Sequence, residues 1–248
     1  MILSHKIHVL TRKEELDNVR VADKVVVVLD VLFATSTMVT ALAHGAQGVI
    51  PVMDEAAARA AAARDADPDT LVLSGELNAV TLPGFAPPTP LALIEHGIAE
   101  RRVILSTTNG TVAMRSCSGA HRVYAGALLN GVALIEHILG AHAGRTLLIV
   151  CSGSANNFNL EDFYGAGYLV DLIAGRLGEH ADFSDAARAA RALFRHADPF
   201  ESLAGCRVGR MTLEHGLEHE VRHAARLSTL EVVPVLDEGM LTAVKSGG

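Results

Sequence analysis

The chain has 248 residues, half of them hydrophobic and 4% aromatic, and its formal net charge is −7. An acidic chain without a nucleic-acid-binding motif suits a phosphate backbone poorly, so we expect no nucleic-acid partner. The N-terminal segment lacks the basic and apolar regions of a secretory signal, and no apolar run is long enough to span a bilayer. We therefore expect a cytoplasmic protein that does not bind membranes.

Three cysteines, Cys117, Cys151 and Cys206, lie at wide and unmatched spacing, which favours reduced thiols over a disulfide framework or a zinc cage. Tryptophan is absent and alanine is abundant, so the core must rest on small and aliphatic side chains. We predict one α/β domain over residues 1–248, with two intimately packed lobes as the alternative. The sequence leaves assembly into a homo-oligomer open.

Short β-branched runs alternate with alanine-rich helical patterns, which is typical of a mostly parallel sheet flanked by helices. Thr11 and Glu14 have the spacing of a capping box, Asp54 precedes an alanine-rich helix, and Thr89 before Pro90 marks another helix start. Predicted strands cover residues 24–29, 48–52, 70–73, 102–105, 122–124, 146–150 and 231–235. Longer helices are predicted over residues 131–140, 161–177, 185–196 and 212–227, with a proline-rich loop at 83–90.

Small polar residues follow four of the predicted strands, in the segments 30–37, 74–76, 106–111 and 151–157. Ligands of parallel sheets bind beyond the carboxyl ends of the strands, and hydroxyls, amides and glycines suit an oxyanion. The same residue types occupy ordinary turns, but four such loops at one edge favour a site for a small-molecule substrate. The predicted substrate-binding residues are Phe33, Thr35, Ser36, Thr37, Thr107, Thr108, Gly110, Thr111, Cys151, Ser152, Gly153 and Ser154.

Four carboxylates, Asp30, Glu76, Glu161 and Asp162, are expected at the same edge, where hard oxygen ligands suit Mg²⁺. We predict that Mg²⁺ binds near Asp30 with Glu76 or Asp162 as further ligands, and that Asp30, Asn109 and Asp162 are catalytic. Helix capping is the alternative for Glu161 and for Asp30. For Asp30 a functional role is favoured, because an unpaired carboxylate directly after an apolar strand is costly unless it meets a cation.

Taken together, the segments 29–37, 74–76, 107–111, 125–130 and 151–153, with Glu161-Asp162 and Ala166-Gly167 beyond them, resemble the 2-phosphosulfolactate phosphatase family. The run Thr107-Thr-Asn-Gly-Thr111 after a strand contributes most to the resemblance, which extends less distinctly to Val233-Pro234. The resemblance implies a distinctive α/β fold and a Mg²⁺-dependent phosphatase. Such an enzyme would cleave a phosphate ester from a three-carbon sulfonated acid in coenzyme M biosynthesis.

Three departures from the family pattern concern charge and the proline-rich loop. Phe33 and Leu77 replace arginines, and Pro87-Pro88-Thr89-Pro90 replaces Gly-Asn-Ser-Pro. The four loops contain neither Lys nor Arg, whereas phosphosulfolactate carries three anionic groups that need cations. The sequence therefore predicts a less charged, partly apolar ligand, unless arginines such as Arg115 or Arg210 reach the site. The alternative is a repurposed enzyme or binding protein for a weakly charged molecule.

Two rival chemistries have weaker signals. His219-Glu-Val-Arg-His223 matches the helical zinc-protease pattern, but charged neighbours favour a solvated helix face. Cys151 at a strand end could act as a nucleophile, although burial is the commoner fate of such a cysteine. Neither the dinucleotide-binding glycine pattern nor the P-loop pattern is present.

Overall fold

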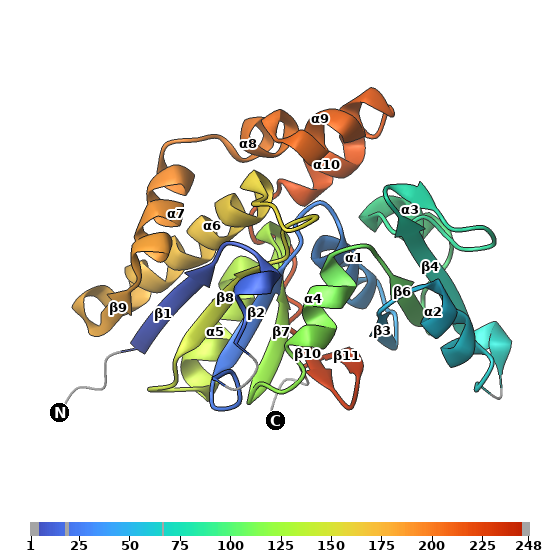
Figure 1. Cartoon of the computed structure of the whole chain (residues 1–248), viewed down its shortest axis with the longest axis horizontal. Coiled ribbons are helices and arrows are strands. Elements are labelled where there is room, and N and C mark those ends of the chain that lie inside the picture. The colour runs from blue at the N-terminus through green and yellow to red at the C-terminus, as the bar shows by residue number, and fades with distance from the viewer. Residues whose placement is uncertain (1–4, 18–19, 66, 245–248) are drawn as a thin grey trace.

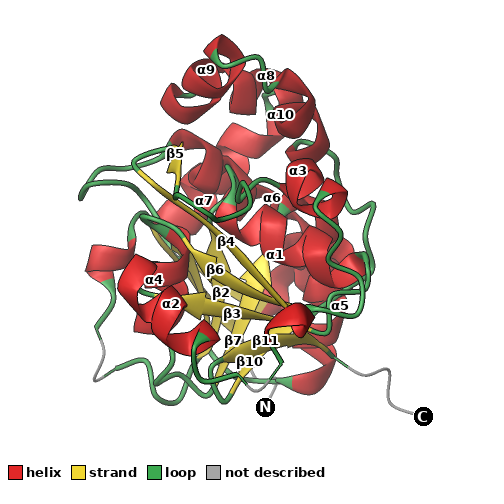
Figure 2. Cartoon of the chain, turned by 90° about the vertical axis from the view of Figure 1, so that its right-hand side faces the viewer, coloured by secondary structure: helices red, strands yellow, loops and turns green. Residues whose placement is uncertain are grey.

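A computed structural model describes residues 5–17, 20–65 and 67–244 of the chain. Its backbone forms an α/β fold in which helices cover a mostly parallel sheet (Figures 1 and 2). This confirms the fold class that the alternation of strand and helix patterns predicts. None of the helices in these ranges has the length and apolar character needed to cross a bilayer.

The sheet has eleven strands within the described residues, in the order β5-β4-β6-β3-β11-β10-β7-β2-β8-β1-β9. Their bounds are β1 His5–Leu10, β2 Val25–Leu29, β3 Gly48–Val52, β4 Leu71–Leu77, β5 Val80–Thr81, β6 Arg102–Ser106, β7 Arg122–Gly126, β8 Leu147–Cys151, β9 Ala181–Phe183, β10 Pro234–Asp237 and β11 Met240–Ala243. Strands β4, β6 and β3 form one parallel group, and β7, β2, β8, β1 and β9 form another. The antiparallel β10–β11 hairpin joins the two groups.

Ten α-helices and four 3₁₀ turns accompany the sheet in the described part of the chain. The helices are α1 Ala34–Ala43, α2 Glu55–Ala62, α3 Pro90–Glu95, α4 Gly110–Ser116, α5 Gly131–Ala141, α6 Leu160–Leu177, α7 Asp185–Arg195, α8 Pro199–Gly205, α9 Arg207–Glu214 and α10 Glu218–Ala224. The 3₁₀ turns are η1 Lys13–Glu15, η2 Pro68–Thr70, η3 Leu128–Asn130 and η4 Gly178–His180. Helices α8, α9 and α10 lie beyond the end of the sheet at which β1 finishes (Figure 1).

Strand β2 lies at the centre of the core and is buried on both faces. Val25, Val27 and Leu29 pack into the cluster that includes α5 and α6, whereas Val26 and Val28 pack into the cluster that includes α1 and α4. Alternate strand residues point to opposite faces, so a run of five apolar residues suits a strand covered on both sides. This burial fixes the position of Asp30, the next residue along the chain.

Several predicted elements need correction. Residues 74–76 are strand rather than loop, because β4 continues to Leu77 and turns through Asn78 and Ala79 into β5. The predicted helix 212–227 is two helices, separated where Gly216 adopts a φ of 74°. Strands β1, β5, β9 and β11 lie outside the predicted strands, and β10 begins three residues later than predicted.

The helix-start predictions had mixed outcomes. Asp54 caps α2 by accepting from the Ala57 amide at 2.8 Å, as predicted. Thr89 precedes Pro90 at the start of α3, although its hydroxyl bonds elsewhere. Thr11 does not form the predicted capping box, since its hydroxyl donates to Glu15 at 2.5 Å in place of the Glu14 reciprocal pair.

Candidate active site

Two pairs of strand ends build the site. At one, Leu29 pairs with Cys151, and the Ser152 amide donates to the Leu29 carbonyl at 2.8 Å, so Ser152 lies beside Asp30. At the other, Gly75 pairs with Ser106, which brings Glu76 next to the β6–α4 loop. Gly110 joins the two pairs, because a Cβ atom there would collide with Asp30. The four segments predicted from the sequence therefore meet at one edge.

Serine and threonine hydroxyls hold the turn from β2 to α1. The Thr35 hydroxyl bonds the backbone N–H and C=O of Asp30 at 2.9 and 3.0 Å. Ser36 and Thr37 donate to the carbonyls of Val31 and Pro88, both at 2.8 Å. All three side chains are buried. These predicted substrate-binding residues therefore spend their hydroxyls on the backbone that positions Asp30.

The β6–α4 loop uses its hydroxyls in a similar way. The Thr111 hydroxyl accepts from the Thr107 amide at 3.0 Å, and the Thr107 hydroxyl accepts from the Thr111 amide at 3.2 Å. Thr108 binds Glu76 through its backbone N–H at 2.6 Å and through its hydroxyl at 3.1 Å. Glu76 also accepts from the Ala79 amide at 2.7 Å. The Glu76 carboxylate thus ties the β4–β5 hairpin to this loop.

Three acids come together at the end of β2. Burial, followed by the negative charges of Glu161 and Glu76, raises the pKa of Asp30 to about 7. Burial and the charges of Asp30 and Glu161 raise the pKa of Asp162 well above its usual range, although Asp162 accepts from the amides of Val31 at 2.9 Å and Gly153 at 3.2 Å. Burial likewise raises the pKa of Glu161. This concentration of negative charge makes the edge a favourable place for a cation.

Magnesium remains a prediction that can be compared with these contacts. Within the described residues, no three His, Cys, Asp or Glu side chains form a ready-made group of metal ligands. Asp162 and Glu76 already accept backbone N–H groups, whereas Asp30 accepts one long bond of 3.4 Å from the Ala34 amide. Mg²⁺ commonly uses one or two carboxylates and completes its shell with water and substrate phosphate. Asp30 and the neighbouring Glu161, whose carboxylate also meets the Cys206 thiol, fit that pattern.

The β8 loop contains a thiol that is poorly suited to catalysis and a hydroxyl without a partner. Cys151 is buried, and burial raises its pKa well above the ordinary value, so a reactive thiolate is disfavoured. The Ser152 Oγ atom is the one buried side-chain nitrogen or oxygen in the described residues that lacks a hydrogen-bond partner. Gly153 follows with a φ of 61°, in the left-handed region that favours glycine. Ser154 lies further out and donates to Asn159 at 2.9 Å.

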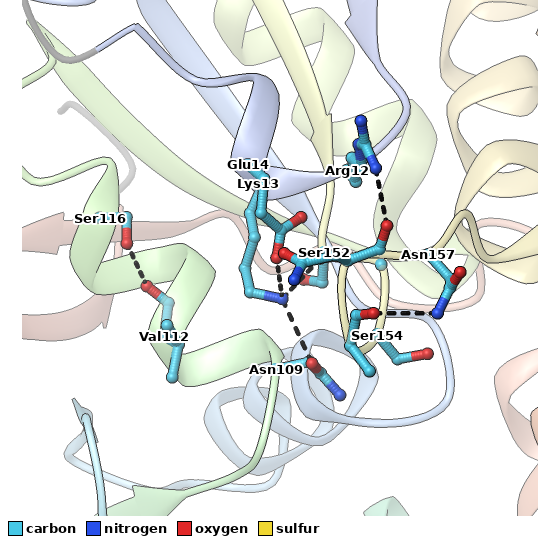
Figure 3. A network of polar contacts seen from close by, with 12 residues as sticks. Arg12, Lys13, Glu14, Asn109, Val112, Ser116, Ser152, Ser154 and Asn157 are labelled. Atoms are coloured by element: carbon cyan, nitrogen blue, oxygen red, sulfur yellow. Dashed lines mark hydrogen bonds and ion pairs between the residues drawn. The ribbon is translucent and has the colours of Figure 1, made fainter.

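Three cations that sequence reasoning missed reach this edge, and one of them, Arg12, donates to the Asn156 carbonyl at 2.7 Å. Lys13 lies in η1 and donates to Asn109 Oδ1 at 3.2 Å and to the Ser152 carbonyl at 3.1 Å (Figure 3). Arg207, at the start of α9, donates to the Ser154 hydroxyl at 2.5 Å. None of the three belongs to a loop that follows one of the predicted strands. An alternating strand pattern over residues 5–10 would have placed Lys13 after a strand end.

The residues named in the charge argument lie in different surroundings. Phe33 is half-buried against the core beside α6, and Leu77 is exposed on the β4–β5 hairpin. Arg115 lies near Gly239 in the β10–β11 turn, and Arg210 in α9 donates to the carbonyl of Gly205 at the end of α8. The cations at this edge among the described residues are therefore Arg12, Lys13 and Arg207 rather than the two arginines suggested by the sequence.

The pattern from His219 to His223 has a structural explanation that differs from the predicted solvated face. Glu220 is fully buried and accepts from the Thr89 hydroxyl at 2.7 Å and from the amides of Leu91 and Ala92 at 2.9 Å. His223 is also buried, and its Nε2 atom lies 3.1 Å from the Thr40 hydroxyl. Glu220 therefore caps α3, and the pair does not offer a zinc site with a free glutamate base.

Comparison with known proteins agrees with this arrangement. Residues 10–239 match the family model described as 2-phosphosulpholactate phosphatase. The chain belongs to the 2-phosphosulfolactate phosphatase family. A protein named "Probable 2-phosphosulfolactate phosphatase" from Carboxydothermus hydrogenoformans is 35% identical over 97% of this chain and 98% of its own length. Proteins of the same name from Symbiobacterium thermophilum and Deinococcus radiodurans are 35% and 37% identical, over 90% and 87% of this chain and 96% and 88% of their own lengths.

The residues matched by the family model, 10–239, include the candidate site. The matched range begins before Lys13 and ends after α10, so it includes the four segments at the sheet edge and the helices that cover them. The resemblance inferred from the motifs is therefore confirmed at the level of the family.

Proposed function

We propose that the protein is a Mg²⁺-dependent phosphatase for a small phosphorylated carboxylic acid, either 2-phosphosulfolactate or a less charged relative. Family membership supports the reaction class. The observation that carries the proposal is the state of Asp30, a half-buried carboxylate beside two other acids that receives one long hydrogen bond. Nearby carboxylates with so few donors are stable together when a cation lies between them.

Asp30 and Glu161 are the side chains that would hold the ion. Bound Mg²⁺ would neutralise phosphoryl oxygens and polarise the ester bond. Asp162 acts as a positioning residue, because its two carboxylate oxygens fix the backbones of Val31 and Gly153 on either side of the site. The Thr35 hydroxyl fixes the backbone of Asp30 itself. These hydrogen bonds fix the backbone on which the Asp30 carboxylate is placed.

Asn109 would orient the substrate at the start of α4. Its Oδ1 atom accepts from Lys13, which sets the side-chain amide so that its N–H groups face away from that ammonium. Gly110 beside it allows the close approach of α4 to Asp30. The side-chain amide of Asn109 and the carboxylate of Asp30 would then contact the same substrate group.

The charge of the substrate is the open part of the proposal. The replacement of the family arginines by Phe33 and Leu77 favours a ligand with fewer anionic groups than phosphosulfolactate. Lys13 and Arg207 restore part of the positive charge from other segments. The proposal therefore includes both phosphosulfolactate and simpler phosphorylated acids.

The test is a phosphate-release screen with Mg²⁺ over 2-phosphosulfolactate, phospholactate and phosphate esters with neutral tails. We expect Mg²⁺-dependent release from at least one phosphorylated acid, and efficient turnover of phosphosulfolactate would overturn the preference for fewer charges. No release from any ester, together with an unphosphorylated ligand found by mass spectrometry of the purified protein, would contradict the proposed activity. That result would favour a repurposed enzyme or binding protein of the same family.

A further inference from the structure

Lys13 occupies an enclosed position between two loops of the site. Its side chain is 13% exposed, and its ammonium group contacts Asn109 Oδ1, the Ser152 carbonyl and the Glu14 carboxylate, the last at 3.1 Å. Figure 3 shows the side chain reaching from η1 to Asn109, with Ser152 close by. The charge of Lys13 also lowers the pKa of Asp30 against the stronger effects that raise it. The positive charge of Lys13 therefore acts on Asp30, the carboxylate that the neighbouring acids also affect.

The three contacts of Lys13 differ in kind. Asn109 and the Ser152 carbonyl belong to the two loops that the fold holds in place, whereas Glu14 is the next residue in the chain and is exposed. An ammonium group has three N–H donors, so an arriving anionic oxygen must replace one acceptor. The Glu14 side chain is 30% exposed, and its carboxylate is the acceptor that can turn away into water at the smallest cost.

Ser152 supplies an independent sign of a missing ligand. Its side chain is fully buried, its carbonyl accepts from Lys13, and its hydroxyl has no partner among the described residues. A buried hydroxyl without a hydrogen bond costs about 1–3 kcal/mol, so such atoms are rare unless something else binds them. Ser152 directly follows β8, beside Asp30.

We propose that Lys13 is the cation that holds the anionic group of the substrate, with the Ser152 hydroxyl as a second contact and Glu14 as the exchangeable partner that the substrate displaces. The inference rests on the proposed function for the nature of the substrate, an anionic phosphate ester. Lys13 then supplies, from η1, charge that Phe33 and Leu77 do not provide. A single ammonium group matches a substrate with fewer anionic groups better than one with three.

The experiment measures binding of inorganic phosphate by calorimetry, in Mg²⁺, to the full chain and to four variants. We expect Lys13→Met to weaken binding about tenfold or more and Lys13→Arg to restore part of it. Ser152→Ala should weaken binding by a smaller factor while the melting temperature holds or rises, because the unpartnered hydroxyl is removed. Lys6→Met is the matched control: Lys6 is an exposed lysine on β1, and its variant should bind phosphate like the wild type.

The phosphate affinity of Glu14→Gln distinguishes substrate binding by Lys13 from a purely structural role of Lys13. If the Glu14 carboxylate competes with the substrate, its removal should tighten phosphate binding about threefold and lower the KM of any ester that is turned over. This variant keeps the test decisive even if Lys13→Met does not fold. Unchanged phosphate affinity in Glu14→Gln would overturn the exchange.

The inference and the proposed function can fail separately. Turnover of an ester with an unchanged KM in a folded Lys13→Met variant would overturn the role of Lys13 and leave the phosphatase activity standing. Phosphate binding that depends on Lys13 but no phosphate release from any ester would support Lys13 and contradict the activity. Absence of phosphate binding by the wild type would overturn the inference directly.

Discussion

Two buried regions of the molecule hold carboxylates in opposite ways. Glu220 in α10 receives three hydrogen bonds from the start of α3, with lengths of 2.7, 2.9 and 2.9 Å. Asp30 at the end of β2 receives one bond of 3.4 Å and lies near the negative charges of Glu161 and Glu76. A carboxylate removed from water is stabilised by donors or by a cation, and Glu220 has the donors that Asp30 lacks.

The difference teaches how to separate a structural acid from a functional one. The sequence around Glu220 resembles a metal-binding motif, yet its donors make the side chain a helix cap. The sequence around Asp30 contains no metal-binding motif, yet burial and the neighbouring acids raise the pKa of Asp30 more than the Ala34 amide and the Lys13 charge lower it. We infer that the number of donors around a buried acid is more informative than the motif in which it lies.

The largest expected effect comes from Asp30→Asn. If Asp30 acts at the reacting group, phosphate release should fall roughly 10²- to 10⁴-fold, while the fold is retained. Asp54→Asn is the matched control, because asparagine can still cap α2 and activity should not change. Activity of Asp30→Asn within a few-fold of the wild type would remove the contrast between the two carboxylates.

The same variant should be more stable without metal. The folded pKa of Asp30 is about 7, above its unfolded value, so the favourable contribution is complete at low pH and is lost as the pH rises through about 7. Asn removes the charge and should therefore raise the melting temperature above pH 7 in EDTA. A clear fall in melting temperature would show that Asp30 is structural.

Glu220→Ala should have the largest effect on stability. It leaves three donors unpaired at the start of α3, and we expect a loss of about 3 kcal/mol in the free energy of unfolding. Glu218→Ala on the same helix is the control, since Glu218 is exposed, pairs with Arg222, and should cost about 0.5 kcal/mol or less. Urea unfolding of both variants would decide, and equal losses would contradict the capping role of Glu220.

The sequence predicted the parallel core of the fold and the edge at which the site lies. Uninterrupted apolar runs marked β2 and β8, and polar residues directly after them marked the strand ends. The carboxyl ends of parallel strands share one edge of the sheet, so Asp30 and Ser152 were expected at the same edge, and the pairing of β2 with β8 makes them neighbours. Asp162 was likewise expected here because it lies at the start of the next long helix.

What the sequence could not provide was the use of each polar atom and the contributions from distant segments. Thr35 and Ser154 have similar side chains, but one bonds a buried turn and the other bonds Arg207. Lys13 was hidden because β1 has only two buried apolar residues, Ile7 and Val9, in an alternating pattern that was overlooked. Such contacts depend on tertiary packing rather than on local spacing.

A polar cluster at β7 and α5 should make stability depend on pH in the direction opposite to Asp30. The Tyr124 hydroxyl lies 3.1 Å from His137 Nε2 and 2.8 Å from His142 Nε2. Burial lowers the pKa of both histidines, and for His142 the charges of His121, His137, Arg145 and Arg122 also contribute. Because the folded pKa values lie below the ordinary value, stability is complete above about pH 6.5 and declines as the pH falls through them.

We expect the two histidines to lower the melting temperature by about 2 °C between about pH 7.5 and about pH 5.5, measured as the difference between Asp30→Asn and the same variant without them. That background matters, because protonation of Asp30 over this range has the opposite sign. Replacing both histidines by glutamine should flatten the dependence. An unchanged slope in the double variant would show that other groups determine it.

The smallest expected effect concerns the hairpin that Glu76 holds. Ala79 adopts a φ of 66°, which is strained for alanine and easy for glycine. Ala79→Gly keeps the N–H that donates to Glu76 and should stabilise the protein by about 0.5–1 kcal/mol without changing activity. Chemical denaturation measures the change, and destabilisation would mean that the alanine methyl group contributes to packing at the hairpin.

The most direct test of the central claim is a calorimetric titration of Mg²⁺ into the wild-type protein, Asp30→Asn and Glu220→Gln. We predict that the wild type and Glu220→Gln bind the ion alike and that Asp30→Asn loses about tenfold or more in affinity, since a charged ligand becomes neutral. Equal Mg²⁺ affinity in the wild type and Asp30→Asn, or no binding to the wild type, would contradict the claim that Asp30, which has one long hydrogen bond, holds a cation.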